Sequence, residues 1–193
     1  YNGCKPQIIG RIQHYISRKA LDIEGLGQET VALLVNANLI KNYSDLYELK
    51  FDQIVGLERM AEKSANNLIT GILDSKKIPF ERVLYGLGIR YVGETVAKKL
   101  AKHFENIDNI LNSDFEELIS VDEIGEKIAN SIIEFSQNSE NVEIINSLKS
   151  HNIQFEIDDS NKNVSSILVG KSFVISGVFA NFSRDELKKL IES

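Results

Sequence analysis

A nine-residue pattern that recurs four times at nearly constant spacing constrains this 193-residue chain more than any other feature. The copies are LGQETVALL at 26–34, MAEKSANNL at 60–68, VGETVAKKL at 92–100 and IGEKIANSI at 124–132. Their second positions are 34, 32 and 32 residues apart, at Gly27, Ala61, Gly93 and Gly125. An internal repeat of this length predicts a fold assembled from equivalent two-element units.

Each copy places small or apolar residues four and seven positions after its second residue, which is the buried stripe of a helix. These residues are Val31, Leu34, Ala65, Leu68, Ala97, Leu100, Ala129 and Ile132. A weaker echo at 64 residues pairs Phe51 with Phe115 and Ile54 with Leu118. Further helix starts are predicted at Ser44 and at a capping box over 113–116. The sequence therefore predicts an all-α domain of tandem two-helix units in two pairs.

The turn before each repeated helix provides a site for an anion. In the first copy, Gly25 and Gly27 allow a tight reversal, and Leu26 points inward and fixes the hairpin. The first N–H groups of the following helix have no intrahelical partner and lie at the positive end of the dipole. Because no side chain intrudes at glycine, a nucleic-acid phosphate can approach, and such binding carries no sequence information.

Four copies in register resemble the helix-hairpin-helix motif of DNA-binding proteins. Ala61, Tyr91 and Glu123 stand where that motif has glycine. Among the copies that contain them, we therefore expect some to support the fold and not to bind DNA. The resemblance implies a DNA-binding domain with four motifs over residues 21–157.

The four hairpins differ in the net charge of the segments around them. The chain carries a net charge of −6, yet residues 1–20 sum to +4 and 76–104 to +5, whereas 105–163 sum to −11. Charge and motif together predict that hairpins one and three bind DNA, and that acids weaken the fourth. The predicted DNA-binding residues are Arg18, Lys19, Gly25, Leu26, Gly27, Arg90, Val92, Gly93, Glu94, Thr95, Lys98 and, for its motif alone, Gly125.

The flanks of the repeat narrow the resemblance to the bacterial NAD-dependent DNA ligases. Residues 1–27 resemble the junction between zinc finger and helix-hairpin-helix domain in that family. The matching residues are Cys4, Pro6, Gln7, His14, Tyr15, Ser17, Arg18, Ala20, Asp22, Ile23, Gly25, Leu26 and Gly27. After a polar linker at 158–164, residues 165–193 resemble the first strand and helix of a BRCT domain, cut off at the end of the sequence.

This resemblance implies a C-terminal piece of a longer enzyme that seals nicks in replication and repair. Residues 1–20 would be a zinc-finger remnant and a connecting helix, poorly supported by the rest, and Cys4 would bind zinc only in the full-length protein. NAD, magnesium and zinc belong to the whole enzyme, and we expect none bound to this piece. The family's adenylated lysine lies in Lys-x-Asp-Gly, and no Asp-Gly occurs here, so we expect no catalytic residue and no ligation by this chain alone.

Two alternatives remain at this stage. Lys127 mimics the catalytic lysine of helix-hairpin-helix glycosylases, but one cysteine cannot hold their iron–sulfur cluster. A non-catalytic tandem helix-hairpin-helix module of a junction-binding or nuclease-accessory protein explains 21–150 but not the flanks. We expect a monomer that binds nicked duplex through its phosphates, in a reducing bacterial cytoplasm. Because no apolar run approaches ~18 residues, we expect no membrane contact.

Overall fold

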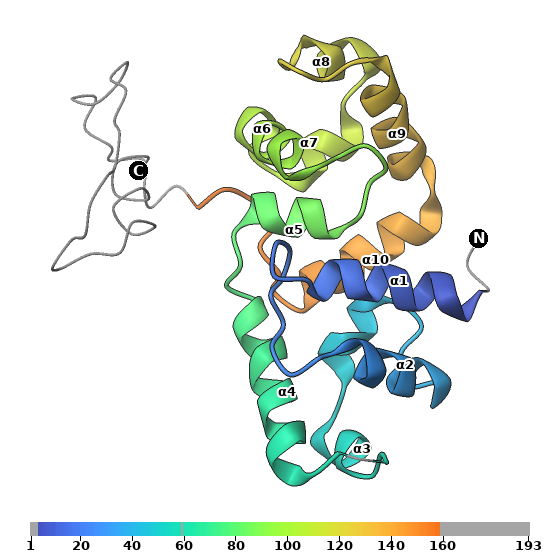
Figure 1. Cartoon of the computed structure of the whole chain (residues 1–193). Helices are drawn as coiled ribbons and strands as arrows, with labels where there is room; N and C mark the ends of the chain where they lie inside the picture. The colour runs from blue at the N-terminus through green and yellow to red at the C-terminus, as the bar shows by residue number, and fades with distance from the viewer. Residues whose placement is uncertain (1–3, 59, 159–193) are drawn as a thin grey trace, which may run out of the picture. The chain divides into compact units, whose positions relative to one another are not determined.

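The computed structural model describes residues 4–58 and 60–158, and up to Ile157 they form one compact unit. The order of its helices is shown in Figure 1. They are α1 (Lys5–Ile16), α2 (Gln28–Asn36), the 3₁₀ helix η1 (Tyr43–Glu48), α3 (Phe51–Val55), α4 (Glu62–Ser75), α5 (Phe80–Gly86), α6 (Glu94–Phe104), α7 (Ile107–Asn112), α8 (Phe115–Ser120), α9 (Glu126–Gln137) and α10 (Ser139–Ser150).

The described residues form no strand, and their one isolated β-bridge joins Asn106 to Glu156. That bridge ties the segment after α10 to the start of α7, where the Ile107 N–H donates to the Phe155 carbonyl at 2.9 Å. The all-α fold class predicted from the sequence is confirmed. In the part of the chain that the structure describes, no helix combines the length and apolarity needed to cross a membrane.

The repeated pattern forms the structural repeat. Helices α2, α4, α6 and α9 begin directly after Gly27, Ala61, Gly93 and Gly125, the second positions of the four copies. All eight residues of the predicted stripe are buried, none more than 1% exposed. Each of these helices packs on an earlier one, in the pairs α1–α2, α3–α4, α5–α6 and α8–α9. The chain is therefore a tandem array of four helix–turn–helix units.

The first helix of the first unit is α1, which overturns the expectation of a poorly supported N-terminal segment. Ile12 and Tyr15 are fully buried, and α1 packs on α2, on η1 and on α5 of the third unit. The first unit thus begins at Lys5, earlier than the boundary at residue 21 that the resemblance implied. Helix α1 is both half of one hairpin unit and a link between the two pairs.

A buried aromatic cluster fixes α1 in place. The ring of Tyr15 stacks on Tyr43 with centroids 4.4 Å apart, and its hydroxyl shares a 3.0 Å hydrogen bond with the hydroxyl of Tyr47. The Tyr47 hydroxyl in turn shares a 3.0 Å hydrogen bond with Ser75 Oγ, which donates to the Ile72 carbonyl. Burial raises the pKa of Tyr15 and Tyr47, so both hydroxyls stay protonated. The cluster joins α1, η1 and α4.

Two predicted helix starts are displaced by one or two residues. The capping box before α8 uses Asp114 with Glu117, whereas the sequence pattern placed it one residue earlier. The helix predicted from Ser44 begins at Tyr43 as a 3₁₀ helix, capped by Asn42, whose side chain accepts from the Ser44 N–H. Neighbouring residues with similar capping side chains compete for one site, and only the backbone conformation decides between them. The BRCT-like segment predicted at 165–193 lies outside the described residues.

Candidate nucleic-acid interface

The hairpin turns share one backbone conformation although their sequences differ. In hairpin three the Val92 N–H donates to the Ile89 carbonyl at 3.0 Å, and in hairpin four Ile124 donates to Val121 at the same distance. The residue at the first-glycine position has a positive φ in each described case, +81° at Gly25, +65° at Tyr91 and +66° at Glu123. Tyr91 and Glu123 therefore replace glycine without changing the turn.

The glycines that directly precede the helices do not have a positive φ, so the backbone conformation does not require glycine there. Gly27, Gly93 and Gly125 have φ values of −79°, −83° and −92°, which any residue adopts. A Cβ added at any of the three would meet nothing within 4 Å. Neither strain nor packing inside this chain therefore explains these glycines, and their bare backbone faces open space.

The helices behind the hairpins also lack capping side chains. The N-cap residue makes no side-chain cap bond at α2, α4, α6 or α9, each of which has nine residues or more. The same holds for α1, α3 and α5, whereas η1, α7, α8 and α10 are capped by an asparagine or aspartate side chain. A helix N-terminus without a cap keeps its backbone N–H donors available, although each of these helices has a glutamate in its first turn. This arrangement suits a phosphate oxygen supplied from outside.

Hairpins one and three are joined through the segment after α1. Lys19 Nζ donates to Glu94 Oε1 at 2.6 Å, and Glu94 is the first residue of α6. The Arg82 guanidinium donates to the Arg18 carbonyl at 2.6 Å, so the backbone before hairpin one is held by α5. His14 Nε2 donates to the Tyr85 carbonyl at 2.8 Å, which gives this histidine a structural role between α1 and α5.

Acidic residues of the fourth hairpin form ion pairs with Lys99, one of the basic residues of the segment 76–104. Lys99 Nζ lies 2.7 Å from Asp122 Oδ2 and 3.0 Å from Glu123 Oε1, and it is 28% exposed. The hydrogen bond to Asp122 raises the pKa of Lys99, and Lys99 lowers the pKa of Asp122. Lys98, the preceding residue on α6, is exposed and makes no ion pair among the described residues. Adjacent lysines thus differ in what they can offer a phosphate.

The predicted site residues occupy three kinds of position. Leu26 and Val92 are about as buried as the core, 5% and 6% exposed, so only their backbone can face a ligand. Gly25 is structural, because a Cβ there would lie 3.3 Å from the Leu68 backbone N. The remaining predicted residues are exposed around the hairpins: Arg18, Lys19, Gly27, Arg90, Gly93, Glu94, Thr95, Lys98 and Gly125.

Two residues at the hairpins were not identified from the sequence. Gly71 lies inside α4, and a Cβ there would stand 2.5 Å from the Glu24 backbone oxygen, so hairpin one rests directly on this helix. A glycine inside an otherwise regular helix pattern was the available signal. Tyr91 is 53% exposed at the tip of hairpin three, with the Arg90 guanidinium carbon 4.8 Å from its ring centroid. An aromatic at a glycine position of the repeat was its signal.

A cleft of about 1210 Å³ lies between α1, η1, hairpin three, α9 and α10, and Arg90 and Val92 of hairpin three are among its lining residues. Its lining mixes Arg11 and Lys41 with Glu134, Glu140 and Glu143. Carboxylates on one wall repel a phosphate backbone, so the cleft does not extend the anion-binding surface.

Metal-binding groups are sparse. Cys4 is exposed at the start of α1, and within residues 4–58 and 60–158 no group of three or more His, Cys, Asp or Glu could hold a metal ion. A structural zinc site needs four ligands, so the described residues alone do not fit one. His103 is exposed, whereas His151 is partly buried against Tyr47 and lies 3.7 Å from Glu48.

The turn geometry, the bare helix N-termini and the fourfold repeat define a tandem helix-hairpin-helix protein. Residues 82–145, which contain hairpins three and four, match a family model described as helix-hairpin-helix motif. Over 193 residues the chain is 63% identical to proteins named DNA ligase from Flavobacterium psychrophilum and Flavobacterium johnsoniae. It is 52% identical over 190 residues to one from Bacteroides fragilis.

The chain is therefore related, along its whole length, to a segment of the bacterial DNA ligases. This confirms the resemblance to DNA ligases seen in the sequence. The chain spans about 29% of the length of these curated relatives. The match includes residues 1–20 and the region after 158, which a stand-alone hairpin module does not explain.

Proposed function

We propose that this chain is the duplex-binding region of an NAD-dependent DNA ligase that seals nicks in replication and repair. Hairpins one and three bind phosphates of the nicked duplex, without regard to its base sequence. The catalytic lysine, NAD, magnesium and a complete zinc site belong to other parts of the longer enzyme, so this region alone holds the substrate and does not join it. The region acts as a monomer in the bacterial cytoplasm.

One observation carries the proposal: Gly27, Gly93 and Gly125 begin uncapped helices, have ordinary φ values, and have open space where a Cβ would be. Glycine at such a position is less favourable for the fold than a capping side chain. Its advantage is that an external backbone can reach the helix N–H groups. The names of the relatives identify DNA as the polymer.

Electrostatics ranks the hairpins. Arg18 and Arg90 have exposed side chains beside hairpins one and three and form no ion pair within the described residues. At hairpin four, Asp122 and Glu123 already form ion pairs with the ammonium group of Lys99. We therefore assign the stronger phosphate contacts to hairpins one and three, and a weaker contact to hairpin four.

The test of the proposal is a titration of labelled nicked duplex with the wild type, Gly93→Asp and Gly125→Asp. Both changes fit the backbone, and a Cβ at either position meets no atom within 4 Å, so both variants should keep the thermal stability of the wild type. Gly93→Asp should weaken binding by about tenfold or more, because a carboxylate replaces the phosphate at α6. Gly125→Asp should weaken it less. Equal binding by wild type and Gly93→Asp would refute the proposal, and a larger effect at Gly125 would reverse the ranking.

The neighbouring lysines of α6 provide a second prediction. Lys98→Ala should reduce the slope of log K against log salt by about one, since one phosphate contact is lost. Lys99→Ala should leave that slope nearly unchanged, because Asp122 and Glu123 already hold its ammonium group. Binding measured at several salt concentrations, with the two variants compared at equal protein stability, checks the difference. Similar slopes for the two variants would show that the ion pairs at hairpin four do not persist on DNA.

A further inference from the structure

We propose that Tyr91 and Arg90, at the tip of hairpin three, form a clip for the sugar-phosphate backbone of duplex DNA. The Tyr91 ring packs against a deoxyribose, and the Arg90 guanidinium binds the adjacent phosphate. This inference rests on the proposed function and adds an apolar contact to a site otherwise built from backbone N–H groups and charges.

The backbone at position 91 favours glycine, yet the chain has an aromatic residue there. Tyr91 has a φ of +65°, in the left-handed region that a bulky residue adopts only with strain. At the equivalent position of hairpin one, glycine is required by the approach of Leu68. At the equivalent position of hairpin four, the side chain of Glu123 binds Lys99. Contacts within the chain therefore explain why hairpin one has Gly25 and hairpin four has Glu123 at this position.

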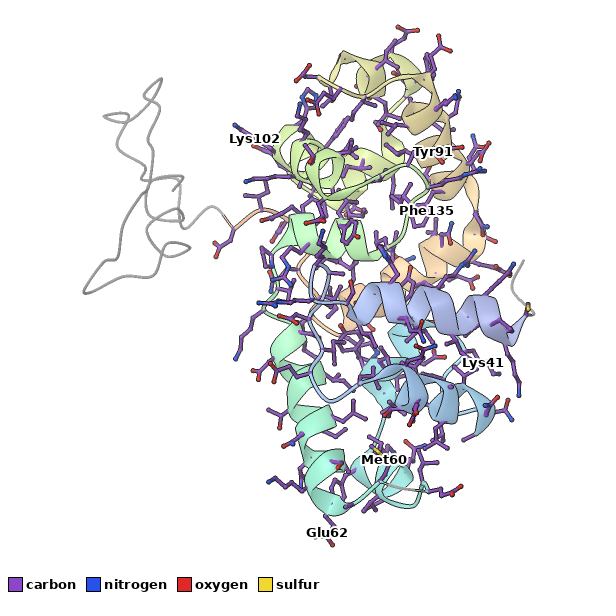
Figure 2. The ribbon with its side chains drawn as sticks, viewed as in Figure 1. Lys41, Met60, Glu62, Tyr91, Lys102 and Phe135 are labelled. Carbon is purple, nitrogen blue, oxygen red and sulfur yellow. The ribbon has the colours of Figure 1, made fainter. Side chains whose placement is uncertain are left out.

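Tyr91 has no comparable explanation inside the chain. Its side chain is 53% exposed, and the neighbour that its ring contacts is Arg90, with the guanidinium carbon 4.8 Å from the ring centroid. Figure 2 labels Tyr91 at the hairpin between α5 and α6, on the side of the view opposite to Lys102. The strained backbone therefore presents a large ring outward without gaining burial in the fold.

The chemistry of this pair matches alternating sugars and phosphates. A guanidinium stacked on an aromatic ring keeps its planar set of N–H donors free at the edge, where they fit a phosphate. The ring supplies apolar area at low cost in side-chain entropy. Gly93 lies two residues further on, at the start of α6, so a phosphate bound at that helix places the neighbouring sugar near position 91.

Tyr91→Gly separates this contact from a structural role. Glycine adopts the turn without strain, so the midpoint of thermal unfolding should stay the same or rise. Affinity for nicked duplex should nevertheless fall about three- to tenfold, with the salt slope unchanged, because the lost contact is apolar. Arg90→Ala should reduce that slope by about one. Tyr91→Phe, which keeps the ring, should bind as the wild type does, and Glu123→Gly, the matched change in hairpin four, should not weaken binding.

Wild-type affinity in Tyr91→Gly would overturn the clip, as would a loss of affinity in Tyr91→Phe equal to that in Tyr91→Gly. The Gly93→Asp variant, titrated in parallel, distinguishes this failure from that of the proposed function. If Gly93→Asp weakens binding and Tyr91→Gly does not, the clip alone is wrong. If neither variant weakens binding, hairpin three does not contact DNA, and the proposed function fails with the clip.

Discussion

Replacing Tyr15 by alanine is expected to lower the free energy of unfolding by about 3–5 kcal/mol, the range for deleting a buried aromatic side chain. Tyr15 is fully buried, stacks on Tyr43 and shares a hydrogen bond with Tyr47. Tyr15→Phe keeps the ring and should cost only about 1 kcal/mol, the value of one hydrogen bond. Urea unfolding followed by circular dichroism measures both variants.

This prediction tests whether α1 belongs to the domain. A peripheral helix would unfold locally and leave the midpoint of global unfolding unchanged, so a loss below about 1 kcal/mol for Tyr15→Ala would contradict the structure. Since α1 also packs on α5, the variant should bind DNA more weakly at temperatures where the wild type is fully folded.

Gly71→Ala is expected to destabilise the protein although alanine is the better helix former. The added Cβ would stand 2.5 Å from the backbone oxygen of Glu24, and backbone cannot move aside as a side chain can. Overpacking of this kind costs about 1–3 kcal/mol, against a gain in helix propensity of about 1 kcal/mol. Hairpin one should shift from α4, so DNA affinity should fall together with stability.

Gly10→Ala is the matched control, because Gly10 also lies inside a helix but has no atom within 4 Å of an added Cβ. This substitution should stabilise the protein by about 0.5–1 kcal/mol. Thermal unfolding of both variants gives the comparison. If Gly71→Ala stabilised the protein as much as Gly10→Ala, hairpin one would not rest on α4 as described.

The repeat made most of the fold predictable. Positions four and seven residues into each copy, such as Ala97 and Leu100, are buried as expected, because helix periodicity depends only on local sequence. The place of α1 was not predictable in the same way. Its apolar residues show one buried face, but their partners are on η1 and α5, tens of residues away, and periodicity does not name a partner. The resemblance to a domain junction placed this helix outside the hairpin domain, whereas it packs on three of its helices.

The site was predictable in its backbone and less so in its charges. Glycine spacing located three of the bare helix N-termini. It could not show that Lys99 is paired while Lys98 makes no ion pair within residues 4–58 and 60–158, since the two are adjacent in sequence and point about 100° apart around a helix. Segment charge counted both lysines equally, and only the packing of α6 beside hairpin four distinguishes them.

Under the proposed function, the packing of α1 against both α2 and α5 has a consequence for how DNA is held. Hairpins one and three are mounted on one rigid frame, so the distance between their anion-binding ends is set when the chain folds. Once one hairpin is engaged, the other meets its phosphate at a high effective concentration and gives up little additional motion. Two weak contacts of this kind hold a duplex far longer than either would alone, yet each can still be released singly.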